Sequence, residues 1–127
     1  MKNHALVLFA HGARDPRWAA PFERLQQLVQ AQSPGSIVAL AFLELMTPRL
    51  PELVAQLIDQ GCDDVTVVPV FLGQGGHVLR DLPVIAEQLR QDHPRLTLKV
   101  VGAVGEDAAV LNAIAKYCID VSAGTEK

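Results

Sequence analysis

The chain has 127 residues and a mass of 13.7 kDa, the size of one ordinary domain. Half of its residues are apolar and a fifth are charged, so it can build a core and is not of the disordered class. Its net charge of −3 and pI of about 5.7 argue against a protein that binds nucleic acid by neutralising phosphates.

Four short apolar runs predict strands that are buried on both faces. They lie at residues 5–10, 36–43, 65–72 and 96–104, are rich in Val, Leu and Ile, and do not alternate with polar residues. This pattern is typical of a parallel sheet. Apolar residues recur at helical spacing within 18–29, 50–58, 82–89 and 110–118, which predicts an amphipathic helix after each strand.

Local signals predict where two of these helices begin and where one ends. Asp15-Pro16 and Thr47-Pro48 each place a capping side chain before a proline, the residue favoured at the first helical position. Gly61 is expected to end the second helix, because glycine adopts the left-handed conformation that commonly follows a helix.

The alternation of strands and helices predicts an α/β fold with right-handed crossovers. We expect a flavodoxin-like three-layer sandwich, in which helices cover both faces of a four-stranded parallel sheet of order 2-1-3-4. No linker divides the chain, so we expect one domain over residues 1–121 and a short polar tail over 122–127.

Three polar side chains are predicted to emerge at one edge of this sheet. His11, Glu44 and His77 each follow or close an apolar run and are 33 residues apart, which is about the length of one strand–helix unit. The carboxyl ends of parallel strands form the edge where open α/β sheets bind ligands. Two imidazoles and a carboxylate can bind a divalent transition metal or transfer protons, and both possibilities remain open on these residues alone.

The same edge carries flexible backbone and positive charge. Gly75 and Gly76 belong to a glycine-rich loop after the third run, where glycine permits unusual dihedral angles and close approach to a ligand. No Gly-Lys-Ser/Thr sequence follows, so the loop is not a P-loop. Arg14, Arg49 and Arg80, together with Arg17, indicate a substrate with several carboxylates.

These motifs resemble those of the class II tetrapyrrole chelatases, and most closely the short CbiX/SirB type. LFAHGARDPR at 8–17 is similar to the HGSRDPR opening of that family, with Ala13 in place of its serine. The later motifs are also similar and follow in the same order over nearly the whole chain, in FLE at 42–44, PVFLG at 69–73, Gly76-His77, Asp81 and Pro83.

The resemblance implies an ATP-independent sirohydrochlorin chelatase that inserts Co²⁺ for cobalamin synthesis, or Fe²⁺ for sirohaem. The short apolar stretch before His11 and the two separated cysteines predict a cytoplasmic location. The resemblance also implies that His11 and His77 hold or deliver the metal and take up pyrrole protons, with Glu44 assisting. Arg14, Arg49 and Arg80, with Gly75 and Gly76, would bind the tetrapyrrole. No cofactor beyond the metal substrate is expected, and short members of the family pair as homodimers.

Two other classes of protein share part of this pattern. A histidine phosphatase also has His-Gly after its first strand, but it needs an arginine before that histidine, and Ala10 stands there. A non-enzymatic, flavodoxin-like carrier of metal or cofactor shares the predicted fold, which does not decide function. A flavin carrier would need hydroxyl-rich loops and aromatic stacking partners, and the first loop has no Ser or Thr.

The sequence gives no sign of a membrane or secretory protein. No apolar run approaches the roughly 20 residues that span a bilayer, and the six apolar residues before His11 are too few for a signal peptide core. Cys62 and Cys118 are far apart and form no CxxC motif, which predicts neither a disulfide framework nor a zinc knuckle. We therefore expect no membrane partner and no nucleic-acid partner.

Overall fold

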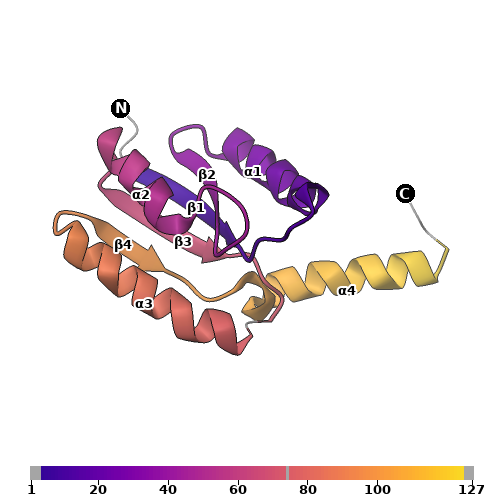
Figure 1. Cartoon of the computed structure of the whole chain (residues 1–127). Coiled ribbons are helices and arrows are strands. Elements are labelled where there is room, and N and C mark those ends of the chain that lie inside the picture. The colour runs from indigo at the N-terminus through magenta and orange to yellow at the C-terminus, as the bar shows by residue number, and fades with distance from the viewer. Residues whose placement is uncertain (1–3, 74, 125–127) are drawn as a thin grey trace.

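Four strands alternate with four α-helices in the computed structural model, which describes residues 4–73 and 75–124 without the side chains of His77 and Leu79. The elements are listed here in chain order: β1 (His4–Ala10), η1 (Pro16–Ala19), α1 (Ala20–Gln32), β2 (Ile37–Phe42), α2 (Leu50–Asp59), β3 (Asp64–Pro69), α3 (Gly76–Asp92), β4 (Thr97–Val100), η2 (Val104–Glu106) and α4 (Ala108–Ser122). Figure 1 shows this arrangement, with α3 below the sheet and α4 extending away from it.

The strands form one parallel sheet of order β2-β1-β3-β4, which confirms the predicted topology. β1 is central and pairs with β2 from Ala5 opposite Ile37 to Ala10 opposite Phe42. Because this register runs to the ends of both strands, the residues that follow β1 and β2 leave the sheet side by side.

Helices α2 and α3 cover one face of the sheet. The strand residues on this face, among them Val7, Phe9 and Val67, are fully buried with Leu53, Leu57 and Leu82 of the two helices in the main core cluster. Burial of such side chains contributes about 1.5–3 kcal/mol each to folding, and the cluster on this face is the larger of the two core clusters.

Helix α1 covers β1 and β2 on the opposite face and also protects the edge of the sheet. Trp18 and Phe22 pack with Phe42 in a second, smaller core cluster. Gln30 accepts a hydrogen bond from the N–H of Val38 at 3.0 Å, and Gln26 donates to the Val38 carbonyl at 3.0 Å. These side chains satisfy backbone groups of an edge strand that would otherwise be open to pairing with another chain.

Of the three predicted helix boundaries, the structure confirms two and contradicts one. Asp15 is the N-cap of η1, with its side chain accepting from the N–H of Arg17, and Gly61 has the left-handed φ of 93° expected after α2. The predicted start at Thr47-Pro48 is wrong, because α2 begins at Leu50 with Pro51 in its first turn. There the Glu52 carboxylate accepts from the N–H of Arg49 at 2.8 Å and so caps the helix without a Thr side chain.

The third and fourth strands are shorter than the apolar runs that predicted them. β3 ends at Pro69, and Val70 to Gly73 lead into α3; β4 ends at Val100, and η2 begins four residues later. Apolar content alone does not distinguish the end of a strand from a partly exposed apolar loop that continues it. No helix in the described part of the chain is long and apolar enough to cross a membrane.

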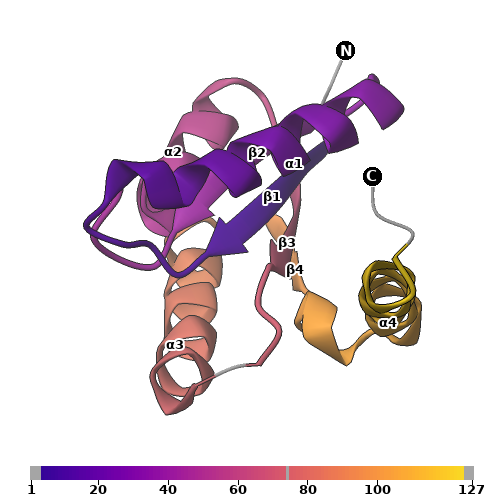
Figure 2. The ribbon, with the colours of Figure 1, turned by 90° about the vertical axis from the view of Figure 1, so that its right-hand side faces the viewer.

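Helix α4 departs from the predicted sandwich in one respect. It continues beyond the carboxyl ends of the strands instead of returning over the sheet, and Figure 2 shows it standing apart from α1, α2 and α3. Its contacts with the rest of the fold fall mainly on η2. The predicted tail begins at Ser122, the last residue of α4, and its residues 125–127 lie outside the described part.

Candidate functional site

The structure brings His11 and Glu44 together at the carboxyl edge of the sheet. His11 directly follows β1, and Glu44 lies two residues after β2. The backbone pairing continues past the strands, because the N–H of Leu43 donates to the Ala10 carbonyl at 2.9 Å and that of Glu44 to the His11 carbonyl at 3.1 Å. The side chains then meet, with Nε2 of His11 3.2 Å from Oε2 of Glu44.

Gly12 makes this close approach of two loops possible. Its φ is 101°, which residues with a Cβ rarely adopt, and a Cβ at this position would overlap the carbonyl oxygen of Glu44. Sequence reasoning gave Gly12 no role of its own. The signal that could have found it is a glycine directly after a polar residue at a strand end, where backbone must often pass close to another loop.

The His11–Glu44 pair is accessible as well as ordered. The two side chains are 39% and 36% exposed, so a metal ion or a substrate proton can reach them from solvent. An imidazole nitrogen and a carboxylate oxygen this close can bind one late first-row divalent ion between them, or share a proton. Both kinds of chemistry predicted for the edge are therefore available to the pair.

His77 is placed by its backbone alone. It lies in the first turn of α3, eight residues beyond the end of β3, rather than directly after that strand as predicted. The start of α3 is at the same edge of the sheet as His11 and Glu44, but the His77 side chain lies outside the described residues. Among the side chains that are described, no group of three His, Cys, Asp or Glu is arranged to hold a metal ion.

The predicted arginines all lie at this edge and are exposed. Arg14 follows β1, Arg49 is the N-cap of α2, and Arg80 lies in the second turn of α3. Nε of Arg80 donates to Asp81 at 3.0 Å, whereas within residues 4–73 and 75–124 no ion pair engages the guanidinium of Arg14 or Arg49. These two cations are therefore available to a ligand.

Arg17 differs from the other cations, because Asp15 neutralises it. Its Nη2 lies 2.7 Å from Oδ2 of Asp15, and its Nε also donates to that carboxylate. The hydrogen bonds from the Arg17 side chain and backbone lower the pKa of Asp15 below its usual value. The ion pair lies at the start of η1, and it leaves Arg17 less able than Arg14 or Arg49 to attract an anionic substrate.

The predicted glycines of the third loop are open but not strained. Gly75 is extended, with φ −72° and ψ 163°, and Gly76 is the first residue of α3. The expectation of unusual dihedral angles is therefore wrong for Gly75. A Cβ at either position would meet nothing within 4 Å, so both positions face open space and neither requires glycine for a tight turn.

A second glycine contact that sequence reasoning missed supports the loop after β3. The N–H of Gly105 in η2 donates to the carbonyl of Phe71 at 2.9 Å, and a Cβ at Gly105 would overlap the Leu72 carbonyl oxygen. Phe71 and Leu72 belong to the segment that connects β3 to α3. The contact with η2 therefore helps to position the segment that leads to His77.

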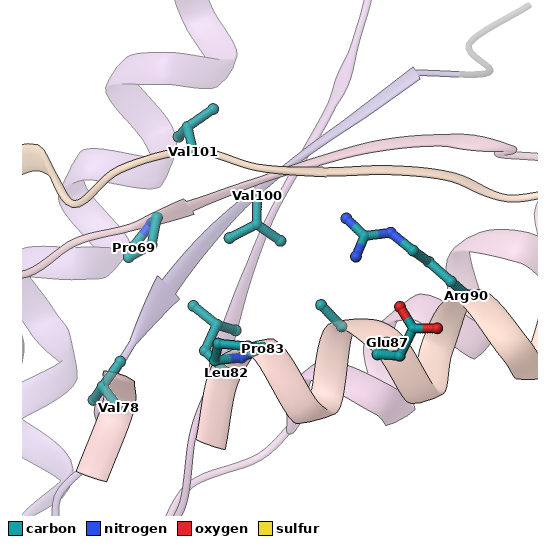
Figure 3. Close-up of a pocket in the computed structure, with 9 residues that line it drawn as sticks. Pro69, Val78, Leu82, Pro83, Glu87, Arg90, Val100 and Val101 are labelled. Atoms are coloured by element: carbon teal, nitrogen blue, oxygen red, sulfur yellow. The ribbon is translucent and has the colours of Figure 1, made fainter. Parts of the chain in front are cut away.

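An apolar cavity of about 440 Å³ lies between α3 and the strands β3 and β4. Figure 3 shows Val78, Leu82 and Pro83 of α3 on one wall and Pro69, Val100 and Val101 on the other, with Glu87 and Arg90 at its far end. Arg90 donates to the Leu98 carbonyl at 2.9 Å. Neither His11 nor Glu44 lines this cavity, so the cavity is separate from the polar pair.

Comparison with known proteins decides the family. The CbiX family model matches residues 5–120. This range includes all four strands, except for the first residue of β1, and nearly all of α4. The chain belongs to the CbiX family. The resemblance in the motifs is thereby confirmed.

Archaeal relatives of this CbiX chain are named sirohydrochlorin cobaltochelatase. The protein of Methanocaldococcus jannaschii is 35% identical over 89 residues, which are 70% of this chain and 62% of the relative. That of Methanopyrus kandleri is 37% identical over 79 residues, which are 62% of this chain and 55% of the relative. The CbiX chain thus spans less than two thirds of the length of these curated relatives.

Solved structures agree with the fold of this CbiX chain. The crystal structure of a protein from Marinobacter aquaeolei VT8, described in terms of CbiX and cobalamin (vitamin B12) biosynthesis, matches with a TM-score of 0.83 and 30% identity over 97% of this chain and 99% of that one. SirB from Bacillus subtilis with Fe³⁺ matches with a TM-score of 0.79 over 95% of this chain and 48% of SirB, at 22% identity. The SirB likeness concerns the fold alone.

Proposed function

We propose that this chain is a sirohydrochlorin chelatase that inserts Co²⁺ into the tetrapyrrole, for cobalamin synthesis. The observation that carries the proposal is the His11–Glu44 pair, 3.2 Å apart and partly exposed at the carboxyl edge of the sheet of a CbiX fold. The names of the archaeal relatives support the choice of tetrapyrrole and metal.

Metal delivery is assigned to His11 and His77. Imidazole binds late first-row divalent ions and also releases them, whereas a set of thiolates would retain them. Of the two cysteines, Cys62 is buried on the core side of the sheet and Cys118 lies on α4, so neither is near His11. The metal is a substrate here, and an exposed site of few ligands suits an ion that must leave.

Proton removal is assigned to His11 and Glu44. Insertion of a divalent ion displaces two protons from the pyrrole nitrogens, and these protons need acceptors within hydrogen-bond reach. Glu44 can accept one as a carboxylate. When the metal leaves Nε2 of His11 for a pyrrole nitrogen, the lone pair of that imidazole nitrogen becomes free to accept the second pyrrole proton. His11 and Glu44 together can therefore accept both protons.

Tetrapyrrole binding is assigned to the rim of the same edge. Arg14 and Arg49 present guanidinium groups that no described carboxylate neutralises, and guanidinium binds carboxylates with two parallel hydrogen bonds. Arg80 would join them by exchanging Asp81 for a substrate carboxylate. Gly75 and Gly76 leave space above the third loop for the edge of a planar macrocycle.

The working form is proposed to be a homodimer. The edge that carries His11 and Glu44 belongs to a single sheet and is open to solvent, whereas a large planar substrate needs a second wall to exclude water. A second copy of the chain would supply that wall, in keeping with the two-fold assemblies that dominate homo-oligomers.

A metallation assay tests the proposed function. The protein is mixed with sirohydrochlorin and with Co²⁺, Fe²⁺ or Ni²⁺ in turn, and the change of the tetrapyrrole absorbance is followed against a protein-free control. Catalysed insertion that is fastest with Co²⁺ supports the proposal. Fastest insertion of Fe²⁺ would instead assign the chain to sirohaem synthesis, and metal binding without any acceleration would make it a metal carrier.

A further inference from the structure

Two exposed leucines lie beside the candidate site. Outside its helices, the described part of the chain exposes two large apolar side chains, Leu45 at 50% and Leu72 at 67%. Leu45 directly follows Glu44 in the loop after β2, and Leu72 lies three residues beyond the end of β3. Because β1 lies between β2 and β3, the two leucines belong to loops on either side of His11 at the carboxyl edge of the sheet.

Leu45 is held in a backbone conformation that leucine disfavours. Its φ is 70°, in the left-handed region, where the Cβ of an ordinary residue comes too close to the following carbonyl oxygen. Within residues 4–73 and 75–124, no other residue except glycine has a positive φ. Asparagine or glycine would adopt this φ at lower cost. Because residues with strained backbone are concentrated at active sites and ligand-binding positions, the φ of Leu45 indicates a function for its side chain.

Both leucines are exposed on loops whose backbone is anchored. The loop after β2 is closed by a hydrogen bond of 3.0 Å from the N–H of Phe42 to the carbonyl of Pro48. The loop after β3 is held by the N–H of Gly105, which donates to the Phe71 carbonyl at 2.9 Å, and a Cβ at Gly105 would overlap the Leu72 carbonyl oxygen. An anchored apolar group loses little conformational freedom when a ligand covers it, which favours binding.

The groups around the leucines match the parts of a tetrapyrrole. A tetrapyrrole is a planar conjugated ring, with nitrogens at its centre, carboxylates on its rim and two apolar faces. The His11–Glu44 pair is assigned to the central nitrogens, and Arg14 and Arg49 are assigned to the rim. Small-molecule sites combine a few polar groups of this kind with apolar side chains that contact the rest of the ligand. Leu45 is placed to supply such a contact, because it directly follows Glu44 in the loop that ends at Arg49.

We propose that Leu45 and Leu72 bind the tetrapyrrole through its apolar surface and so hold its nitrogens at the His11–Glu44 pair. The inference rests on the proposed function, and it adds two apolar contacts to the polar ones assigned there. Hydrophobic contacts are not screened by salt in the way that ion pairs are. The leucines and the arginines should therefore contribute to binding in ways that an experiment can separate.

Titration of metal-free sirohydrochlorin, followed by its absorbance, tests the two contacts. Leu45→Asn and Leu72→Asn should each raise the Kd for the tetrapyrrole at least about fivefold, because each removes the burial of about half of a leucine side chain. The factor should be the same at about 20 mM and about 500 mM NaCl. Leu28→Asn is the matched control, because Leu28 is 59% exposed near the end of α1 that leads into β2, and its Kd should stay within about twofold of the wild type.

Thermal melts separate binding by Leu45 from a structural role. Leu45→Ala and Leu45→Asn both remove the apolar side chain, but asparagine adopts the left-handed φ more readily. The Tm of Leu45→Asn should therefore be about 2–4 °C above that of Leu45→Ala, although both variants lose tetrapyrrole affinity to a similar extent. If Leu45 had only a structural role, affinity would follow stability, and Leu45→Asn would bind the tetrapyrrole better than Leu45→Ala.

The remaining outcomes distinguish this inference from the proposed function. A wild-type chain that binds and metallates sirohydrochlorin, with Leu45→Asn and Leu72→Asn binding it equally well, would reject the apolar contacts and retain the chelatase. A wild-type chain that does not bind sirohydrochlorin would reject both. If the two variants change the sedimentation of the protein but not its Kd for the tetrapyrrole, a second copy of the chain covers the leucines, and the inference is overturned.

Discussion

Substitution of Gly12 by alanine should damage the site and the stability of the fold together. At φ 101° an alanine costs about 1–2 kcal/mol, and its Cβ would overlap the Glu44 carbonyl oxygen. Relief of that overlap requires a shift of the loop after β1 or of the loop after β2, at a further cost of about 1–3 kcal/mol. We therefore expect a loss of about 2–5 kcal/mol in the free energy of unfolding and a fall in Tm of roughly 6–20 °C.

The same shift separates His11 from Glu44, so Co²⁺ insertion should slow at least tenfold in the protein that remains folded. Chemical denaturation gives the free energy of unfolding, and the absorbance of sirohydrochlorin gives the rate. Gly35→Ala is the matched control, because a Cβ at Gly35 meets nothing within 4 Å and its φ is not in the left-handed range. If the two variants are equally stable and equally active, the close approach of the loops has no part in forming the site.

Three further predictions concern charge and burial. Arg14→Ala and Arg49→Ala should weaken tetrapyrrole binding less at high salt than at low salt, because salt screens contacts between arginine and exposed carboxylates. An equal loss of tetrapyrrole affinity at about 20 mM and about 500 mM NaCl would contradict this prediction. Arg17 lowers the pKa of Asp15, so the stabilisation by this carboxylate is fully present above the unfolded value near pH 4 and is lost as pH falls through the lower folded value. Between pH 5 and pH 3 the melting temperature of the wild type should therefore fall more than that of Asp15→Asn. Burial raises the pKa of the Cys62 thiol, so in Cys118→Ser protein iodoacetamide should label no thiol until the chain unfolds.

The fold could be predicted largely because the central strand β1 is buried on both faces, although β3 and β4, which were predicted to be buried in the same way, alternate between buried and more exposed residues. A run such as residues 5–10 has no polar side chain to place in water, and only a central parallel strand buries all of it. The meeting of His11 with Glu44 followed from the same reasoning, since the carboxyl ends of neighbouring parallel strands form one edge. Neither inference needed any knowledge of side-chain packing.

The features that were not predicted depend on contacts between distant residues. The role of Gly12 depends on the position of Glu44, and that of Gly105 on Leu72. Thr47-Pro48 has the form of a helix start, but Glu52 caps α2 from within its first turn. An amphipathic pattern over α4 indicates that one side of the helix is to be buried, yet it does not say whether the same chain or a second copy covers it.

The rate of Co²⁺ insertion by histidine variants tests the central claim most directly. His11→Ala, His77→Ala and the double variant are assayed with sirohydrochlorin after thermal melts have shown that each is folded, with Glu44→Gln beside them. Each histidine variant should lose most of the catalysed rate while still binding the tetrapyrrole, and Glu44→Gln should lose less, because it removes a proton acceptor and leaves both imidazoles. A folded double variant that inserts Co²⁺ at the wild-type rate, well above the protein-free background, would contradict the assignment of metal delivery to these histidines.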